Sequence, residues 1–576
     1  MVSDARLVST RVDYVMAQAI PAMTQSGQQV LILKEGSSQT KGREAQRNNI
    51  MAAKIIAEIV KTSLGPRGMD KMLVDGMGDV TITNDGATML KEIDVQHPAA
   101  KMMVEISKTT DNEVGDGTTS SVVVAGALLE RAEELLAQDI HPTVIVDGYR
   151  KAATQSLKIL DKISIKIKPT DKTQLVKLAI TALRSKLVSR ESANLADRAV
   201  DAVLSVAEPD GTSYTIDIDN VKIEKKPGRS LKDTSLIKGI VLDKEVVHAG
   251  MPKRVEKARI ALINSAFEIE KTEFDAKLNI TDPSQMTAFL DEENSLLKGM
   301  VDSIINTGAN VVVCQKGIDD IAQHYLAKAG ILSVRRAKQS DIDKLAKASG
   351  ARVITNFEDI TKKDLGQAEL VEERKLEDDK WVFIEGCKNP KAVTLLIRGG
   401  SQRVVDEAER SIHDAMMVTK DVLEKPAVVA GGGAPEAQIA HQLRKWAEKL
   451  TGREQLAAQK FADAMEAIPL TLAENAGLDI IDTQVDLRAK HSQGKKWAGI
   501  SVVDAGVVDI YSKNIIEPLK VKEQIIKSSV EAASMLLRID DVIASGKMKE
   551  PPPGAGGGMP PGMGGMGGMG GMPGMM

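Results

Sequence analysis

The stretch Val114–Leu129, VGDGTTSSVVVAGALL, places one carboxylate between two glycines, follows it with four hydroxyl residues and then runs into an apolar segment of helical length. Glycines allow positive φ and a close approach of the backbone to a ligand. Ser and Thr favour the start of a helix, where unpaired N–H groups and the helix dipole favour phosphate. Because bare phosphate would repel Asp116, the pattern predicts a bridging Mg²⁺, which proteins usually hold with one or two carboxylates plus phosphate oxygens. A capped helix after a glycine turn explains the same residues, since short glycine motifs often occur without a ligand.

The composition of the 576-residue chain is that of a globular protein of several domains, with 43% hydrophobic and 27% charged residues. A net charge of −4 gives no basic field for nucleic acid or anionic lipid, and 2% aromatic residues leave few platforms for stacking bases. Cys314 and Cys387 form neither a disulfide framework nor a zinc-finger spacing, which fits a reducing cytoplasm. No apolar run approaches the roughly 18 residues of a membrane helix, and no secretory signal pattern is visible. We therefore expect a cytoplasmic protein with neither nucleic acid nor a membrane as partner.

Periodicity along the chain predicts helical regions on both sides of a central α/β region. Residues 47–68 have helical spacing up to the breaker Gly65-Pro66, and the pattern from Pro142 to about Ala207 is helical throughout. Between about 239 and 389, buried strands alternate with amphipathic helices, which is typical of a separate α/β domain. The residues after Glu550 are all Gly, Met, Pro or Ala, so we expect a disordered tail.

Acidic residues stand at three unusual positions. Asp85 lies in an Asn-Asp-Gly turn, Asp116 lies between its glycines, and Asp414 lies inside an amphipathic helical pattern beside apolar residues. Transfer of a phosphoryl group to water needs a cradle, a metal and a carboxylate that orients or deprotonates the water, and the chain offers candidates for each. A plain turn residue at position 85 and a helix surface charge at position 414 are the alternatives. The sequence contains no Walker A motif, no kinase glycine loop with its partner motifs and no His-Glu-x-x-His motif.

From about Val30 to Gly546 the chain resembles the group II chaperonins, the archaeal thermosome subunits. The resemblance rests on the order and spacing of the stretches QRNNIMAAKIIAEIVKTSLGPRGMDKMLVD, GDVTITNDGATMLKEIDVQHPAAKM, EVGDGTTSSVVV, EKTEFDAKLNITDPSQ, VVVCQKGIDDIAQHYLAKAGILSVRR, VTLLIRGGS, HDAM, VVAGGGAPE and EPLKVKEQII. It implies an ATPase whose rings, usually two of eight identical or paralogous subunits each, enclose a non-native client protein beneath a built-in lid.

The resemblance also implies a multidomain fold of the α and α/β classes. The mostly helical equatorial ATPase domain would comprise residues 23–170 and 426–549, and a small α/β intermediate domain residues 171–238 and 389–425. Residues 239–388 would form an α/β apical domain that binds the client, with a helical lid protrusion at about 268–300. The disordered ends would be residues 1–22 and 550–576.

A nucleotide site made from both halves of the chain is implied as well. Asp116 would hold Mg²⁺, while Asp85 and Asp414 would place the attacking water, one of them taking its proton. Lys186 would sense the γ-phosphate, although its surroundings, TALRSKLVS, differ from the family's usual Thr-Gly-Lys pattern. The remaining positions implied to bind ATP are Leu64, Gly65, Pro66, Gly117, Thr118, Thr119, Gly431, Gly432 and Glu517.

Two functions of other classes compete with this interpretation. A passive holdase would bind apolar surface without turnover, but it would not need a pair of carboxylates to activate water. A small-molecule kinase could use the same phosphate cradle, but the sequence suggests no pocket for a phosphoryl acceptor.

Overall fold

The structure is a computed structural model, which describes residues 21–23, 29–31, 38–186, 188–211, 213–269, 283–387 and 390–544. The described residues form two compact units, one within 47–538 and one from the flanking residues. The expected disordered tail, 550–576, lies outside the described residues, as do residues 1–20 of the expected N-terminal extension. In the described part of the chain, no helix is long and apolar enough to cross a membrane.

The flanking unit joins residues from the two ends of the sequence. Its strands are β1 (Pro21–Met23), β2 (Gln29–Leu31), β3 (Ser38–Lys41) and β23 (Asp541–Ala544). β1 pairs antiparallel with β2, from Pro21 opposite Leu31 to Met23 opposite Gln29. β3 pairs antiparallel with β23, from Ser38 opposite Ala544 to Lys41 opposite Asp541.

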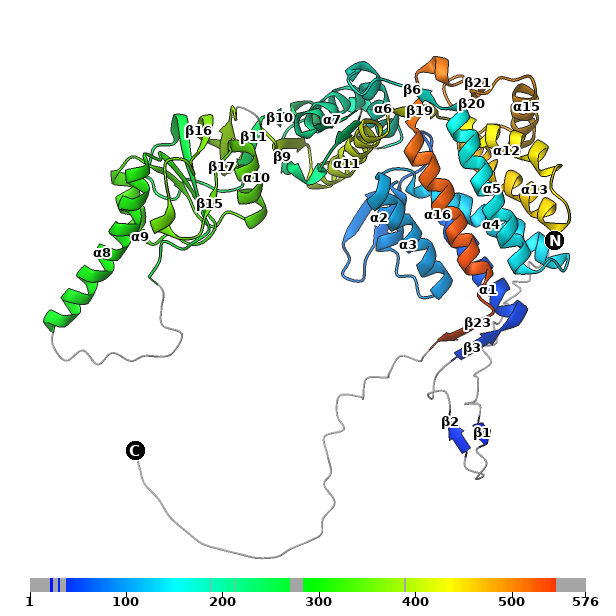
Figure 1. Ribbon diagram of the computed structural model, residues 1–576, viewed down its shortest axis with the longest axis horizontal. Coiled ribbons are helices and arrows are strands. Elements are labelled where there is room, and N and C mark those ends of the chain that lie inside the picture. Colours follow the sequence, from blue (N-terminus) through cyan, green and yellow to red (C-terminus); the bar gives the residue numbers. More distant parts are fainter. Residues whose placement is uncertain are drawn as a thin grey trace, which may run out of the picture. The chain divides into compact units, whose positions relative to one another are not determined.

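The larger unit contains a helical region built from early and late segments of the sequence (Figure 1). Its helices are α1 (Gly42–Lys61, whose first residues belong to the flanking unit), α2 (Gly86–Glu92), α3 (Pro98–Val114), α4 (Thr118–Ala137), α5 (Pro142–Ile163), α12 (Ala434–Ala447), α13 (Arg453–Met465), α14 (Ala467–Asn475), α15 (Ile480–Ser492) and α16 (Leu519–Leu537). α16 packs against α3, α4 and α5, and α13 packs against α4, α5 and α12. At the centre of this packing the buried Tyr149 hydroxyl donates to the Leu128 carbonyl at 2.8 Å, and its ring meets Phe461 edge to face.

Short strands complete the helical region. They are β4 (Lys71–Val74) with β5 (Val80–Thr83), β20 (Ala498–Ser501) with β21 (Gly506–Asp509), and the sheet of β6 (Ile165–Lys166), β19 (Ala427–Ala430) and β22 (Ile516–Pro518). β6 interrupts the run expected to be helical throughout, because Ile165 and Lys166 pair with β19 from the far half of the chain. α1 also ends earlier than expected, since residues 62–64 form a turn closed by the Ser63 N–H and hydroxyl, both donating to the Val60 carbonyl.

A second region packs three helices on a three-stranded sheet. Its main elements are α6 (Lys172–Arg184), α7 (Ser192–Val206), α11 (Gln402–Glu424), β9 (Val221–Pro227), β10 (Ser235–Ile237) and β18 (Val393–Gly399). β18 is central, parallel to β9 and antiparallel to β10. Its buried Val393, Leu395 and Ile397 join a core with apolar residues of all three helices. The hairpin of β7 (Glu208–Asp210) and β8 (Ser213–Thr215) adjoins this region.

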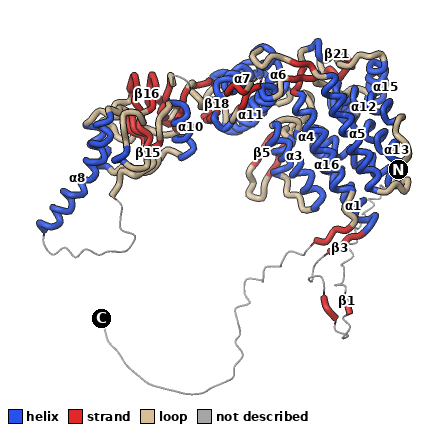
Figure 2. Tube along the Cα trace, viewed as in Figure 1, coloured by secondary structure: helices blue, strands red, loops and turns tan. Residues whose placement is uncertain are grey.

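The middle of the chain, where strand–helix alternation predicted an α/β domain, forms a seven-stranded sheet of parallel and antiparallel pairs with its own buried core (Figure 2). In sheet order the strands are β11 (Gly239–Leu242), β17 (Asp379–Glu385), β16 (Gly366–Leu376), β12 (Arg254–Ile263), β13 (Val311–Cys314) and β14 (Leu332–Val334), with β15 (Val353–Ile354) also on β12. The helices are α8 (Pro283–Thr307), α9 (Asp320–Lys328) and α10 (Gln339–Ser349). Residues 270–282 of the expected lid protrusion lie outside the described residues; its described remainder is residues 268–269 and the part of α8 up to residue 300.

The charged stretch 370–386 forms the antiparallel β16–β17 hairpin. Arg374 spans its two strands, donating to both carboxylate oxygens of Glu385 at 2.8 and 2.6 Å. Cys314 and Cys387 are both buried and unpaired, so neither forms a disulfide.

Glu466 fixes the junction of α12, α14 and α15. Its buried carboxylate accepts from Arg444 at 2.7 Å, from Arg488 at 3.0 and 2.5 Å and from Gln484 at 2.9 Å. Burial alone would raise the pKa of Glu466, but the two arginines outweigh it and lower the pKa to about 2. The ionised carboxylate therefore stabilises the folded chain.

We expect Glu466→Gln to destabilise the chain at neutral pH by on the order of 3 kcal/mol, the worth of a pKa lowered by two to three units. A carboxylate with a lowered folded pKa contributes stability above its unfolded pKa of about 4.5 and loses it as pH falls towards about 2. Thermal unfolding midpoints between pH 7 and 3 should therefore fall less steeply for the variant than for the unaltered chain. Equal slopes would contradict this role for Glu466.

Candidate active site

A cavity of about 470 Å³ opens between the early and late segments of the helical region and α6 and α11 of the second region. Seven of the residues singled out from the sequence line it, namely Leu64, Gly65, Pro66, Asp116, Gly117, Gly432 and Glu517. Apolar side chains, among them Ile468, Leu472, Ile500 and Val521, supply much of the remaining wall. A mostly apolar wall with a few converging polar groups is typical of a small-molecule site.

The loop before α4 has the conformation that its glycines suggested. Gly115 and Gly117 have φ of +65° and +77°, and the Gly117 N–H donates to Asp116 Oδ1 at 2.7 Å. α4 begins at Thr118 with no side chain capping it. The N–H groups of its first turn therefore stay available for an anion beside the Asp116 carboxylate.

These residues fit Mg²⁺ bound together with phosphate. Within the described residues, no three His, Cys, Asp or Glu side chains are grouped to hold a metal alone. Asp116 would supply one carboxylate, and a cation there would take its other ligands from phosphate and water, as Mg²⁺ commonly does. The donor set is therefore adequate for a metal that arrives bound to phosphate.

Asp85 and Asp414 lie on either side of one buried ammonium group. Lys186 Nζ is 2.9 Å from Asp414 Oδ2 and 3.6 Å from Asp85 Oδ1, and each of these three side chains is about one-tenth exposed. Asp85 also caps α2 by accepting the Thr88 N–H at 2.8 Å. The Asn84 side-chain amide donates to the Ser185 carbonyl, which ties the Asp85 turn to the loop that carries Lys186.

The structure therefore distinguishes the alternatives left by the sequence. The interpretation of Asp414 as a helix surface charge is wrong, because Asp414 is 6% exposed and paired with Lys186. Asp85 is a turn residue, as the plain interpretation had it, but its second oxygen also faces Lys186. The Asp85 carboxylate thus caps α2 and also pairs with Lys186, which lies far away in the sequence.

The two carboxyl groups differ in proton affinity. Burial raises the pKa of Asp414 well above its usual value, although Lys186 opposes the rise. Burial also acts on Asp85, but Lys186 and the hydrogen bonds from Thr88 and Thr118 outweigh it and lower its pKa. Groups whose pKa values are pushed apart in this way suit an acid–base pair, with Asp414 as the group that takes a proton.

Of the hydroxyl residues at the start of α4, some contact the turn at Asp85 and one lines the cavity. Thr118 Oγ1 donates to Asp85 Oδ1 at 3.3 Å, and Thr119 packs against Gly86, so neither side chain lines the cavity. Ser120 lines it instead, and sequence reasoning had not selected that residue. The backbone N–H groups of Thr118 and Thr119 remain in the open first turn of α4.

Two further residues of the site were not predicted from the sequence. They are Asp111, a third carboxyl group near Lys186, and Lys522, an ion-paired lysine in the cavity wall. Burial, with the charge of Asp85 adding to it, raises the pKa of Asp111 to about 6. Lys522 lines the cavity and pairs with Glu517 and Glu436, which are likewise held close together. The signal for Lys522 was its place three and four residues before Ile525 and Ile526, on the apolar face of α16.

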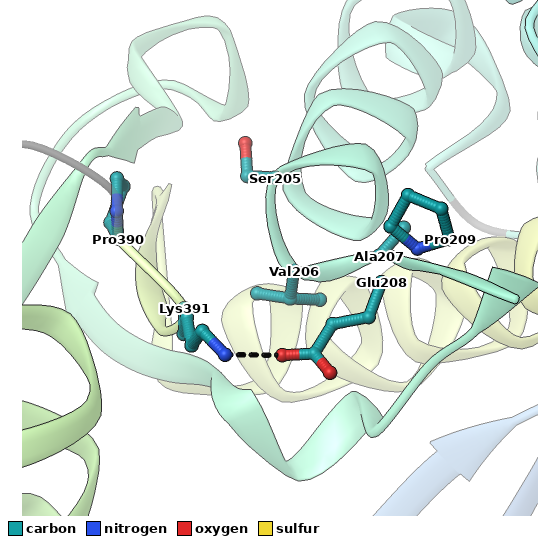
Figure 3. Close-up of a pocket in the computed structure, with 7 residues that line it drawn as sticks. All are labelled: Ser205, Val206, Ala207, Glu208, Pro209, Pro390 and Lys391. Carbon is teal, nitrogen blue, oxygen red and sulfur yellow. Dashed lines mark hydrogen bonds and ion pairs between the residues drawn. The ribbon is translucent and has the colours of Figure 1, made fainter.

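A second hollow, of about 480 Å³, lies at the end of α7 between residues 205–209 and 390–391 (Figure 3). Its charged groups are Glu208 and Lys391, which pair with each other at 2.8 Å and are mostly exposed. The two hollows are similar in size, so volume does not indicate which one is the functional site, and the residues that line them must be compared. The cavity at Asp116 is the candidate site because Asp116, Glu517, Lys522 and the open start of α4 line it. Asp85, Lys186 and Asp414 are not among its lining residues, although Ser185, next to Lys186 in the chain, is.

Comparison with known proteins identifies the family of the chain. The model of the TCP-1/cpn60 chaperonin family matches residues 56–547. The chain belongs to the TCP-1/cpn60 chaperonin family.

Named relatives of this chaperonin are similar over almost their whole length. Thermosome subunit alpha of Archaeoglobus fulgidus is 59% identical over 537 residues, which are 93% of this chain and 98% of the relative. Thermosome subunits of Methanopyrus kandleri and Pyrococcus abyssi are 58% and 56% identical, over 91% and 92% of this chain and 96% and 97% of their own lengths. The resemblance found in the sequence motifs is thereby confirmed.

Gly115 brings the chaperonin's α11 close to the Asp116 loop. A Cβ atom at Gly115 would lie 2.3 Å from Met417 Cβ, one helical turn after Asp414. We expect Gly115→Ala to push α11 away, to lower the thermal unfolding midpoint and to reduce ATP hydrolysis at least about tenfold, because small misplacements of reacting groups are costly. Gly330→Ala is the matched control, since Gly330 has a similar φ of +72° but open space around its Cα. Equal effects of the two substitutions would contradict the close-approach argument.

Proposed function

We propose that this chaperonin chain is an ATPase subunit of a double ring that encloses non-native proteins and promotes their folding, with lid closure driven by ATP binding and hydrolysis. The observation that carries the proposal is the buried Lys186 ammonium between Asp85 and Asp414 beside a cavity with an open helix start. Family membership supports the same function, since chaperonins of this family are ATP-dependent folding machines.

ATP with Mg²⁺ is the ligand that the cavity suits. We assign the phosphates to the first turn of α4, at Gly117, Thr118 and Thr119, and the metal to Asp116. The nucleoside would lie among residues 64–66, Gly431, Gly432 and Glu517 and the apolar wall. Mg²⁺ would supply charge neutralisation on the phosphates, while the chain's own groups bind, orient and exchange the proton.

Hydrolysis needs a group that accepts the proton of the attacking water. We assign that role to Asp414, whose raised pKa makes it the stronger base, and the orientation of the water to Asp85, which stays ionised. Lys186 would keep both carboxylates in place and respond to the γ-phosphate. Because α11 carries Asp414 and packs in the second region, its approach to the nucleotide would couple chemistry to domain closure.

The domain layout follows from the same proposal. The equatorial domain would be residues 23–170 and 426–549, the intermediate domain 171–238 and 389–425, and the apical domain 239–388 with its lid near 268–300. The separate cores of the second region and of the seven-stranded sheet support the intermediate and apical assignments. The partners would be identical or paralogous subunits, usually eight per ring, and non-native clients.

Asp414→Asn tests the assignment of the base. We expect ATP hydrolysis to fall by at least about a hundredfold, the usual worth of a general base, while ATP affinity stays within a few-fold. Asp406→Asn on the same helix is the control, because Asp406 pairs with Lys225 at a partly exposed site. Turnover by Asp414→Asn equal to that of the control would refute the role of Asp414.

Electron microscopy of the purified full chain, with and without ATP, tests the assembly. We expect a double ring that closes when ATP is added, and deletion of residues 268–300 should keep the ring and its ATPase but expose a bound client to protease. A lone chain indifferent to ATP would overturn the proposed function. Continued protease protection by the deletion variant would overturn the lid assignment only.

A further inference from the structure

A third hollow, of about 470 Å³, lies between α5 and α16, which pack side by side in the helical region (Figure 1). Polar residues of α16 line it at intervals of three or four positions, so they share one face of that helix. They are Lys527, Glu531, Ser534 and Arg538. From α5, Arg150 and Thr154 line it with the same spacing. None of these six residues lines the cavity at Asp116, so the hollow is a separate feature of the molecule.

Positive charge dominates this hollow, although the chain as a whole carries a net charge of −4. Arg150, Lys527 and Arg538 line it, against the single carboxylate of Glu531. None of these four side chains forms an ion pair with another residue in the described part of the chain. By contrast, both lysines in the first turn of α16 are paired with carboxylates. The hollow therefore collects cations that the protein itself leaves without a counter-charge.

A buried hydroxyl group in the wall of the hollow also lacks a partner. Ser534 is 4% exposed, and its Oγ forms no hydrogen bond with any described residue. Serines inside helices often return the hydroxyl to the carbonyl four residues earlier, as Ser529 does on the same helix by donating to the Ile525 carbonyl at 2.6 Å. Leaving a buried polar group unsatisfied is costly, so an acceptor placed beside Ser534 would be favoured.

These donors suit phosphate groups. A guanidinium group binds phosphate oxygens through two parallel N–H bonds, and an ammonium group adds a compact positive charge. The hydroxyl of Ser534 would donate one further hydrogen bond to the same kind of oxygen. The volume of the hollow lies within the range of about 300–1,000 Å³ found for small-molecule sites. It therefore offers room for a molecule larger than a single simple ion.

We propose that the hollow between α5 and α16 binds a compact molecule with several phosphate groups. Arg150, Lys527 and Arg538 hold the phosphates, and the Ser534 hydroxyl donates a further hydrogen bond. Glu531 lies at the same face and disfavours ligands that lack enough negative charge to outweigh its own. This site is independent of the proposed hydrolysis of ATP, because it uses none of the residues assigned to that reaction.

Calorimetric titration of the full chain with inorganic tripolyphosphate tests this inference. Divalent cations are removed for the titration, so that the Asp116 carboxylate repels phosphate from the other cavity. We expect the unaltered chain to bind tripolyphosphate, and the double variant Lys527→Gln, Arg538→Gln to lose at least about a hundredfold in affinity. The reason is that each hydrogen bond between charged partners is worth roughly tenfold or more. An unchanged affinity in the double variant would overturn the inference.

Lys158→Gln is the matched control, because Lys158 is an exposed cation on α5 that does not line the hollow. We expect it to keep the affinity for tripolyphosphate. A loss as large as that of the double variant would mean a general attraction of anions to the surface and would overturn the inference.

Citrate, a polyanion made of carboxylates, separates recognition of phosphate from attraction by charge alone. We expect the unaltered chain to bind citrate at least about tenfold more weakly than tripolyphosphate, and equal affinities would overturn the assignment to phosphate.

Ser534→Ala tests the buried hydroxyl. We expect it to weaken the binding of tripolyphosphate without lowering the thermal unfolding midpoint, because the hydroxyl has no partner in the protein to lose. A lower midpoint with unchanged affinity would contradict its role as a ligand donor.

A contact between two copies of this chain is the competing explanation of the unpaired cations. In that case the unaltered chain would bind no tripolyphosphate, and the double variant would fail to assemble. That pair of results would overturn the inference, whereas binding by the unaltered chain with normal assembly of the double variant would support it.

Discussion

The site depends on the burial of one ammonium group, that of Lys186, between carboxylates from distant parts of the chain. An isolated buried charge is very costly, and a buried pair is tolerated only with good geometry and further hydrogen bonds. Asp414 at 2.9 Å and Asp85 at 3.6 Å meet that condition, and Thr118 and Thr88 satisfy the oxygens of Asp85. The start of α2, the loop after α6 and the middle of α11 must therefore meet at one point.

Carboxylates outnumber cations within the Lys186 cluster itself. Asp85, Asp111, Asp116 and Asp414 all interact electrostatically there, and Lys186 is the cation that pairs with Asp85 and Asp414. The imbalance explains why burial and neighbouring carboxylates raise the pKa of Asp111 and Asp414. It also gives a physical reason for a divalent cation to accompany an anionic ligand into the cavity, since the ion would relieve repulsion that the protein does not relieve itself.

Glycines decide how closely the elements around the cavity approach one another. At Gly115, Met417 of α11 occupies the space that a Cβ would need, and at Gly432 the Ile500 carbonyl lies 2.8 Å from such an atom. Both glycines have positive φ, so the backbone conformation and the close contact each require glycine at these positions. The sequence predicted these turns because glycine is the residue that adopts positive φ without strain. It gave no sign of which side chains would fill the space.

Much of the local structure could be read from the sequence. The helix start at Pro142, the turn at Asp85 and the glycine loop before α4 depend on neighbouring residues, so local pattern predicted them. Two local predictions were wrong for a tertiary reason. The helical run after Pro142 is interrupted by β6 because β19 offers it hydrogen bonds, and α1 stops at Lys61, whose carbonyl accepts a hydrogen bond from the Asn475 side-chain amide at 3.1 Å.

The sequence by itself determined the elements, the glycine turns, the acids available for chemistry and, through its motifs, the chaperonin family. Only the tertiary structure decided which charges are buried and which groups share them. Asp414 looked like a possible surface charge, and Lys522 and Glu436 drew no attention, because a single helix period cannot reveal what packs on its far side. The physical reason is that burial costs and ion pairing depend on contacts between residues hundreds of positions apart, such as Lys186 with Asp414, which no local pattern contains.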